Sequence, residues 1–336
     1  MDKDRFFPPR KIHEMRWAHT HTSILKTAVE LDVFNHIAQG RTSVQGVARA
    51  SRSSTRGMEM LLNALVGFEL LRKNRVRYRL TLESRVFLVK GSPLYLGKNF
   101  LLRGASMELW SDLTRAVKRG KPVRTKSISA LRKRFLPELA KAIFPGSYIK
   151  ARALAQSWNY PRGREEYRIL DVAAGSSAWS LPFAERFKGV RVTALDFPEV
   201  LLITSKYARE LGVGHQYSYL PGDLEVVDFG RDGYDLIILG NICHSIGVRK
   251  SQRLFRKCKR ALKRKGHLLI ADSLPNDRRD GPLFPLVFAL NMLLHSEEGN
   301  VFTFREYKSW LTKAGLQGVK TLKVPQAPSP LILARR

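Results

Sequence analysis

Acidic, amide and imidazole side chains follow five apolar runs of the sequence, each where a strand is expected to end. They are Asp171, Asp196, Asp223, the segment 241–244 and Asp272. The carboxyl ends of parallel strands meet at one edge of a doubly wound sheet, where ligands bind. Carboxylates at that edge can accept hydrogen bonds from ribose hydroxyls or an adenine amino group, and a neutral histidine can take a hydroxyl proton. The pattern favours an adenosine ligand beside a proton-transfer site.

The segment after the first of these runs reads "DVAAGSSAWS", residues 171–180, and contains one glycine, Gly175. No G-x-G-x-x-G is present to admit a pyrophosphate, so a dinucleotide ligand is disfavoured. Ala173 is unstrained there if its φ is negative. A positive φ at Ser177 would cost roughly 1 kcal/mol and weaken ligand binding by around tenfold. We predict a ligand-binding loop that is altered but still works.

Simpler structural roles compete with each functional interpretation. An aspartate at a strand end often caps a helix or forms a turn, and His244 alone would be an ordinary loop histidine. The apolar segment 282–295 is either the wall of a substrate pocket or a core helix whose polar residues bond locally. The residues of such a wall would be Phe288, Asn291, Met292 and His295.

The second half of the chain alternates strand and helix patterns, which predicts a mostly parallel sheet with helices on both faces. The expected strands are 168–172, 190–195, 217–220, 234–239, 267–272, 319–324 and 331–334. The expected helices are 179–187, 199–211, 251–263, 282–294 and 304–314. We therefore expect an α/β Rossmann-like domain with a seven-stranded sheet over residues 161–336.

The first half is mainly helical in pattern. A helix over 12–38, two further helices and a hairpin over 72–81 predict a winged-helix domain, residues 1–97. Such a domain can dimerise or place a helix in a DNA groove. We expect residues 98–160 to form a helical bridge that contributes to a substrate pocket, with interruptions at Gly120–Pro122 and at Pro145-Gly146.

Composition limits the class of protein. A hydrophobic content of 44% permits a sizeable core, while the net charge of +30 would suit a polyanion binder. The segment from Leu113 to Pro137 contains no acidic residue, which would suit a polyanion-binding patch. No aromatic residue lies between Arg115 and Lys133 to stack on a nucleic-acid base, so a solvated basic surface is favoured. Two cysteines without metal-ligand spacing, no secretory signal and no membrane span favour a reduced, cytoplasmic protein without a metal.

Several segments occur in an order typical of one enzyme family. They include "ILDVAAGSSAWSLPFAERF", "VTALDFPEV", "GDLEVVDFG", "YDLIILGNICHSIG" and "LFRKCKRALKRKGHLLIAD". The chain resembles S-adenosylmethionine-dependent O-methyltransferases of the type that includes plant caffeate, hydroxyindole and bacterial polyketide O-methyltransferases. The resemblance covers nearly the whole chain, because that family also has an N-terminal winged-helix dimerisation domain. It implies a homodimer that uses S-adenosylmethionine.

The resemblance also implies roles for individual residues. The implied cofactor-binding residues are Asp171, Ala173, Gly175, Asp196, Phe197, Asp223, Leu224 and Asn241. Asp171 and Gly175 would shape the methionine end of the site and Asp196 would bind the ribose. Asp223 with Leu224 would bind the adenine. His244 would be the catalytic base, and Asp272 would orient its ring.

The chain departs from the family pattern in the loop 171–180, where Ala173, Ala174 and Ser177 stand at positions that are glycine in common members, and at further positions near the implied active site. Gly240 stands where plant members have lysine, Ile246 where they have tryptophan, and the segment 298–301 leaves a second active-site acid unassigned. The favoured function is transfer of a methyl group to a hydroxyl of a hydrophobic aromatic, polyketide-like or carotenoid-like small molecule. The alternative is a nucleic-acid-binding regulator that uses the winged helix and the basic segment, with a degenerate or ligand-sensing methyltransferase domain.

Overall fold

The computed structural model describes residues 9–97, 104–124, 131–159, 166–325, 327 and 329–336, which form two compact units, Met1–Gly104 and Ala105–Arg336. Parts of the predicted bridge, including Lys126 of the basic segment, lie outside the described residues. No helix among the described residues is long and apolar enough to cross a bilayer.

The first unit consists of short helices and a hairpin around one core. Its elements are α1 (Arg10–Glu30), α2 (Val33–Ala38), α3 (Val44–Ala50), α4 (Thr55–Gly67), β1 (Leu71–Asn74), β2 (Arg77–Leu80) and α5 (Leu82–Phe87). Ser43 and Ser54 cap α3 and α4 by accepting hydrogen bonds from backbone N–H groups. The predicted helix 12–38 is divided at Asp32, whose φ is +54°. Helix, helix and hairpin follow one another as expected for a winged helix.

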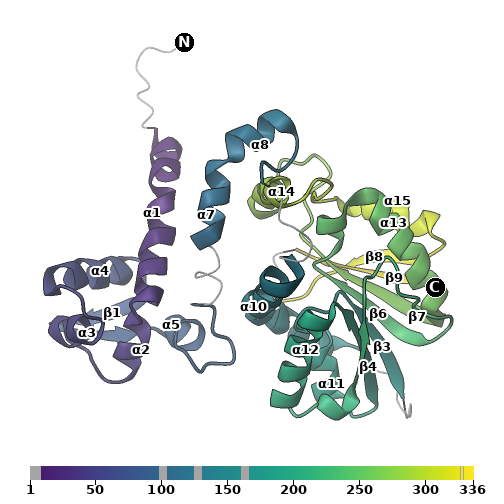
Figure 1. Cartoon of the computed structure of the whole chain (residues 1–336), viewed down its shortest axis with the longest axis horizontal. Coiled ribbons are helices and arrows are strands. Elements are labelled where there is room, and N and C mark those ends of the chain that lie inside the picture. The colour runs from purple at the N-terminus through teal and green to yellow at the C-terminus, as the bar shows by residue number, and fades with distance from the viewer. Residues whose placement is uncertain (1–8, 98–103, 125–130, 160–165, 326, 328) are drawn as a thin grey trace. The chain divides into compact units, whose positions relative to one another are not determined.

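The second unit contains a seven-stranded sheet in the order β5-β4-β3-β6-β7-β9-β8 (Figure 1). Its strands are β3 (Tyr167–Val172), β4 (Val190–Asp196), β5 (Tyr217–Pro221), β6 (Tyr234–Gly240), β7 (Leu262–Ala271), β8 (Gln317–Leu322) and β9 (Leu331–Arg335). The five strands β5, β4, β3, β6 and β7 pair in parallel, each with its neighbour in this order, and β9 pairs antiparallel with both β7 and β8. The carboxyl ends of five parallel strands therefore share one edge, as the sequence predicts.

Helices cover both faces of this sheet and bury two apolar clusters (Figure 1). On one face lie α10 (Leu136–Ser157), α11 (Leu181–Arg186) and α12 (Pro198–Glu210); on the other lie α13 (Cys243–Ala261) and α15 (Phe304–Lys313). The unit also contains α7 (Gly104–Ser111), α8 (Leu113–Arg119), the π-helix η1 (Leu131–Phe135), the 3₁₀ turn η2 (Gly214–Gln216) and α14 (Leu283–His295).

Several predicted boundaries are wrong, and two of them bear on the position of the site. Helix α10 continues through Pro145 and Gly146, where the sequence predicts a break. Burial of residues along α10, such as Phe144 and Ala151, against the sheet domain offsets the backbone hydrogen bond that proline removes. Helix α13 begins at Cys243 instead of residue 251, so His244 lies in a helical turn and not in a loop.

Candidate active site

His244 and Asp272 form a buried pair where β6 and β7 end. His244 Nδ1 lies 2.5 Å from Asp272 Oδ1, and the His244 backbone N–H donates to Asp272 Oδ2 at 3.1 Å. Adjacent strands bring the two residues together, since Gly240 at the end of β6 pairs with Ala271 at the end of β7. The side chains are 9% and 2% exposed, so little water competes for these contacts.

Two further donors hold the Asp272 carboxylate. The Tyr307 hydroxyl donates to Oδ2 at 2.8 Å and the Ser273 backbone N–H donates to Oδ1 at 2.9 Å. Burial alone would raise the pKa of Asp272, but the His244 ring and these hydrogen bonds outweigh it and lower the pKa below its ordinary value. An ionised carboxylate only accepts hydrogen bonds, which assigns the proton to His244 Nδ1 and leaves Nε2 as an acceptor.

The turn that carries His244, residues 243–246, is separated from the rest of α13 by Gly247. This glycine has φ +76° and ψ −179°, and a Cβ there would lie 2.7 Å from both Cβ and the backbone oxygen of Glu298. The Asn300 backbone N–H donates to the His244 carbonyl at 2.9 Å. The segment 298–300 and Gly247 together fix the position of the turn.

Asp196 closes the β3–α11 loop, residues 171–180, from the neighbouring strand. Its Oδ2 accepts from the Gly175 N–H at 2.8 Å and its Oδ1 from the Phe197 N–H at 2.7 Å. Burial raises the pKa of Asp196 to about 6, because neither backbone donor fully compensates for the lost hydration. Among the described residues no basic side chain forms an ion pair with it.

Asp171 lies at the start of the same loop, 2% exposed. The Ser180 hydroxyl donates to its Oδ2 at 2.6 Å and lies 2.9 Å from the Tyr217 hydroxyl. Burial nevertheless raises the pKa of Asp171 to about 7. In a chain of net charge +30, two buried acids without a basic partner in the described part are a distinctive feature of this edge.

The loop contains two residues in the left-handed region that are not glycine. Ala173 has φ +53° and Ser177 has φ +54°. Ala173 therefore lacks the negative φ at which alanine is unstrained, and Ser177 has the positive φ for which strain is predicted. Each conformation costs roughly 1 kcal/mol relative to glycine. The Ser177 hydroxyl is buried and has no partner of hydrogen-bonding geometry in the described residues.

Gly240, where the family's plant members have lysine, faces the Trp179 indole. A Cβ at Gly240 would overlap the five-membered ring, with Nε1 at 2.8 Å. Trp179 is 6% exposed, and its Nε1 has no hydrogen-bond acceptor in the described part of the chain. The tryptophan thus fills space that only glycine leaves open.

The other predicted cofactor residues lie along the same edge. Asn241 has φ +59°; its N–H donates to Ala271 and its side chain to Ser147 of α10 at 3.3 Å. Asp223 is exposed after β5 and accepts from the Glu225 N–H. The Leu224 carbonyl accepts from Lys257 at 2.6 Å, and the Phe197 ring lies under the Arg132 guanidinium at 4.1 Å.

Comparison with known proteins identifies the family. Residues 162–317 match the O-methyltransferase domain and residues 17–90 match the O-methyltransferase dimerisation domain. A structure from Nostoc punctiforme assigned as an O-methyltransferase is 31% identical, with a TM-score of 0.87, and the match covers 99% of this chain and all of that one. The chain belongs to the O-methyltransferase family.

Two further relatives of this O-methyltransferase are informative. A 3-hydroxy-5-methyl-1-naphthoate 3-O-methyltransferase from Streptomyces sahachiroi is 27% identical over 90% of this chain and 88% of its own length. Human N-acetylserotonin methyltransferase, solved in complex with SAM, shares the fold with a TM-score of 0.84 and 24% identity, covering 100% of this chain and 99% of that one. The predicted family and fold are confirmed.

In this O-methyltransferase the residues predicted for the substrate pocket separate into two groups. The Phe288 ring meets the His244 ring edge to face at 4.9 Å, and Met292 is buried nearby on α14. His295 is exposed and its Nδ1 lies 2.8 Å from the Asn291 carbonyl, a local bond like that of the core-helix interpretation. The His295 ring also stacks on the Phe135 ring at 6.3 Å between centroids. The geometry therefore brings Phe288 to His244 and directs His295 to its own helix and to Phe135.

Sequence reasoning missed three side chains at this edge. Tyr307 lies in α15, 35 residues after Asp272, and nothing in the local pattern signals its contact. The role of Trp179 follows from its packing against Gly240, which the sequence alone does not reveal. Arg132 belongs to the basic segment treated as solvated, yet its guanidinium lies on Phe197. All three depend on packing between segments far apart in sequence.

Proposed function

We propose that this O-methyltransferase transfers the methyl group of S-adenosylmethionine to a hydroxyl of a hydrophobic small molecule of aromatic, polyketide-like or carotenoid-like type, with His244 as general base. The observation that carries the proposal is the His244–Asp272 pair, at the same sheet edge as two buried acids without a basic partner in the described residues. The naphthoate hydroxyl named for the Streptomyces relative supports an aromatic hydroxyl as the acceptor.

The residues of the edge fit the cofactor. S-adenosylmethionine, when bound, supplies an electrophilic methyl group on a positively charged sulfur. Buried carboxylates suit such a cation and its ribose hydroxyls, because each retains acceptor capacity beyond the N–H and O–H donors it already has. Asp171, Ala173 and Gly175 would lie at the methionine end. The adenosine part would be held by Asp196, Phe197, Asp223 and Leu224, with Asn241 completing the site.

His244 is suited to remove the acceptor's proton. With Nδ1 donating to Asp272, the Nε2 lone pair would take the hydroxyl proton as the oxygen bonds to the methyl carbon. The carbon–sulfur bond of the cofactor would break at the same time, its electron pair returning to sulfur in the neutral demethylated product. The imidazolium that results is stabilised by the Asp272 carboxylate, which Tyr307 and Ser273 keep in place. The proton passes to solvent after the methylated product leaves, so the base is regenerated.

The Phe288 edge beside His244 gives the acceptor an apolar surface at the reacting position. We place Met292 in the same wall and keep Asn291 and His295 as candidate contacts for the distal part of the substrate. The dimerisation domain supports a homodimer. Helix α1 adds to that support, because its large apolar side chains Ile12, Met15 and Trp17 are 70%, 78% and 61% exposed.

Calorimetric titration with S-adenosylmethionine and its demethylated product, beside an Asp196→Ala variant, tests the cofactor assignment. We expect binding by the wild type and its loss in the variant. Incubation with labelled cofactor and a panel of hydroxylated naphthoates and phenols then tests the reaction, with O-methyl products expected. Binding without transfer to any hydroxyl, or transfer to an amine instead, would contradict the proposal.

A further inference from the structure

A groove lies at the opposite edge of the sheet from His244, at the amino ends of β3 and β4. Its volume is about 370 Å³ and its lining includes Arg168, Arg191, Thr193, Ser218 and Arg231. The connection from β5 to β6, residues 222–233, contains no helix. This part of the sheet face therefore lacks the helical cover that α13 gives to another part of the same face. Polar side chains stand where a helix would otherwise require apolar ones.

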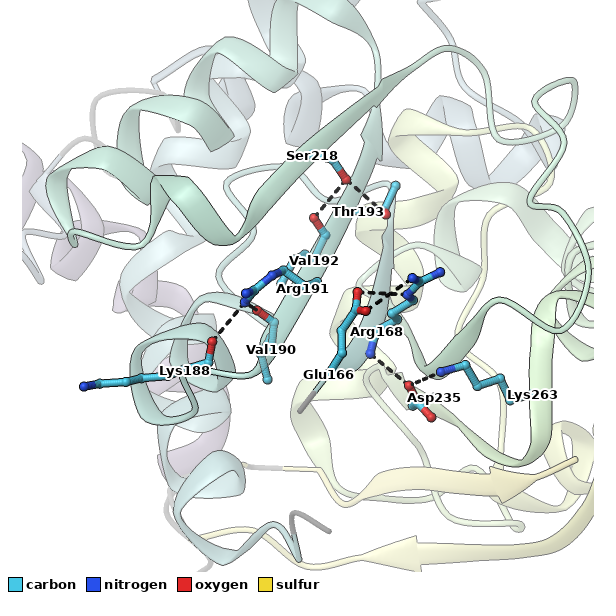
Figure 2. A network of polar contacts seen from close by, with 10 residues as sticks. All are labelled: Glu166, Arg168, Lys188, Val190, Arg191, Val192, Thr193, Ser218, Asp235 and Lys263. Carbon is cyan, nitrogen blue, oxygen red and sulfur yellow. Dashed lines mark hydrogen bonds and ion pairs between the residues drawn. The ribbon is translucent and has the colours of Figure 1, made fainter. Parts of the chain in front are cut away.

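Two arginines of the groove are direct neighbours across the sheet. Arg168 and Arg191 are register partners on parallel strands, and their side chains project from the same face. Like charges in such a pair are unfavourable. Glu166 neutralises Arg168 through two hydrogen bonds of 2.9 and 3.3 Å, whereas Arg191 binds the carbonyls of Lys188 and Val190 (Figure 2).

The groove keeps a net positive charge, because Arg168, Arg191 and Arg231 line it together with one described carboxylate, that of Glu166. Arg191 lies close enough to help lower the pKa of Glu166 but forms no ion pair with a described residue, and its Nε and Nη2 make no hydrogen bond there. Arg231, which also lines the groove, likewise forms no ion pair with a described residue. The other acid of the network, Asp235, is engaged by Lys263 at 2.7 Å and by the Arg168 backbone N–H (Figure 2).

Hydroxyl groups complete the donor set. Thr193 and Ser218 are register partners whose oxygens lie 3.2 Å apart, and Ser218 also donates to the Val192 carbonyl at 3.3 Å (Figure 2). One of the two hydroxyl protons lies between the two oxygens, and Ser218 can donate the other to a ligand in place of the Val192 carbonyl. Guanidinium groups with free N–H donors beside hydroxyls match an oxyanion that has several acceptor oxygens.

We propose that this groove binds a phosphate group, either inorganic phosphate or the phosphate of a small phosphomonoester. Its volume lies at the small end of the range for ligand pockets, which suits a compact anion and not a nucleic-acid strand. Arg191 and Arg231 are the principal donors, with Thr193 and Ser218 beside them. The site is separate from the proposed methyl-transfer site and does not depend on it.

The test compares two variants of equal charge. Arg191→Gln/Arg231→Gln removes the groove donors, and Arg209→Gln/Arg256→Gln removes two exposed arginines of α12 and α13 as the matched control. Phosphate binding is measured by calorimetry and by the shift of the melting temperature, against chloride at equal ionic strength. We expect the groove variant to weaken phosphate binding by about tenfold or more and the control by less than about twofold.

Two outcomes would overturn the proposal: no phosphate binding by the wild type beyond chloride, or equal weakening in both variants, which would assign binding to the overall charge. Ribose 5-phosphate and adenosine monophosphate separate the sources. Tighter binding of either, lost in the groove variant, assigns the site to an organic phosphate; equal or weaker binding assigns it to inorganic phosphate. Melting in chloride checks that both variants fold.

Discussion

Two parts of the same sheet edge, the turn 243–246 and the loop 171–180, differ in the partners available to their buried polar groups. In the turn, Asp272 receives hydrogen bonds from His244, Tyr307 and Ser273. In the loop, Asp171 and Asp196 have raised pKa values, and the buried Trp179 Nε1 has no hydrogen-bond acceptor in the described residues. The turn is complete within the protein, whereas the loop is suited to completion by a ligand.

This difference gives the two segments different properties: the turn is held rigid by the protein alone, whereas the stability of the loop depends on a bound ligand. A fully bonded network holds one tautomer and one orientation before any ligand arrives, which is what a proton acceptor requires. Buried acids without a basic partner in the described residues, by contrast, cost free energy that a cationic ligand can recover on binding. Changes in the turn should therefore alter rate, and changes in the loop should alter affinity and stability.

The largest effect is expected from His244→Ala. Loss of a positioned base should lower kcat about 10²–10⁴-fold, while affinity for S-adenosylmethionine, measured by calorimetry, changes little. His244→Gln, which retains a polar side chain of similar reach, should be nearly as slow. An alanine variant with wild-type turnover would show that the turn does not carry the base.

Gly240→Ala should be the next largest. The added methyl group overlaps the Trp179 ring, so we expect the free energy of unfolding in urea to fall by about 2 kcal/mol. Gly146→Ala is the matched control, because a Cβ there meets nothing within 4 Å. Adding Trp179→Leu should recover part of the loss. If Gly240→Ala and Gly146→Ala were equally stable, the packing of the loop against β6 would be looser than the structure indicates.

Cofactor affinity should depend on pH through the loop acids. Burial raises the pKa of Asp196 to about 6 and of Asp171 to about 7, so both become ionised as pH rises through that range. Affinity for the cationic cofactor should rise about tenfold between about pH 5 and pH 7.5. Calorimetry with Asp196→Asn and Asp171→Asn should show a flatter profile, and a profile unchanged in both would assign the dependence to other groups.

The same acids set the sign of the stability change without ligand. A folded pKa above the unfolded value means that the folded state binds the extra proton. The free energy of unfolding should therefore decrease as pH rises from about 4 to about 7 and stop decreasing above it. The measurement is the free energy of unfolding of the ligand-free wild type minus that of each asparagine variant, followed from about pH 4 to about pH 7. A difference that increases over that window would contradict the assignment.

The smallest effect is expected from Ser177→Gly. Relief of the left-handed strain at Ser177 should raise the free energy of unfolding by about 1 kcal/mol. Ala174→Gly, at a neighbouring position outside the left-handed region, should instead lower it by about 0.5–1 kcal/mol. Thermal unfolding distinguishes the two. The same sign in both variants would mean that strain does not distinguish these positions.

Much of the fold followed from local pattern. Alternating apolar runs predicted the strands that end at Asp171, Asp196 and Asp272, because burial on both faces leaves a strong signal in the sequence. The start of α13 and the continuity of α10 through Pro145 were missed, since tertiary burial overrides local propensity there. The φ values of Ala173 and Ser177 depend on closure of the loop by the neighbouring strand, which no local pattern encodes.

Gly247 has a consequence for how such a chain changes over generations. Because it joins the turn 243–246 to the rest of α13 in a conformation that side chains rarely adopt, a replacement would displace the turn but leave the buried face of the helix able to pack. A descendant could then inherit the architecture without the chemistry. Descendants that keep the fold but have lost catalytic activity should therefore have substitutions at position 247 before they have substitutions in the apolar core.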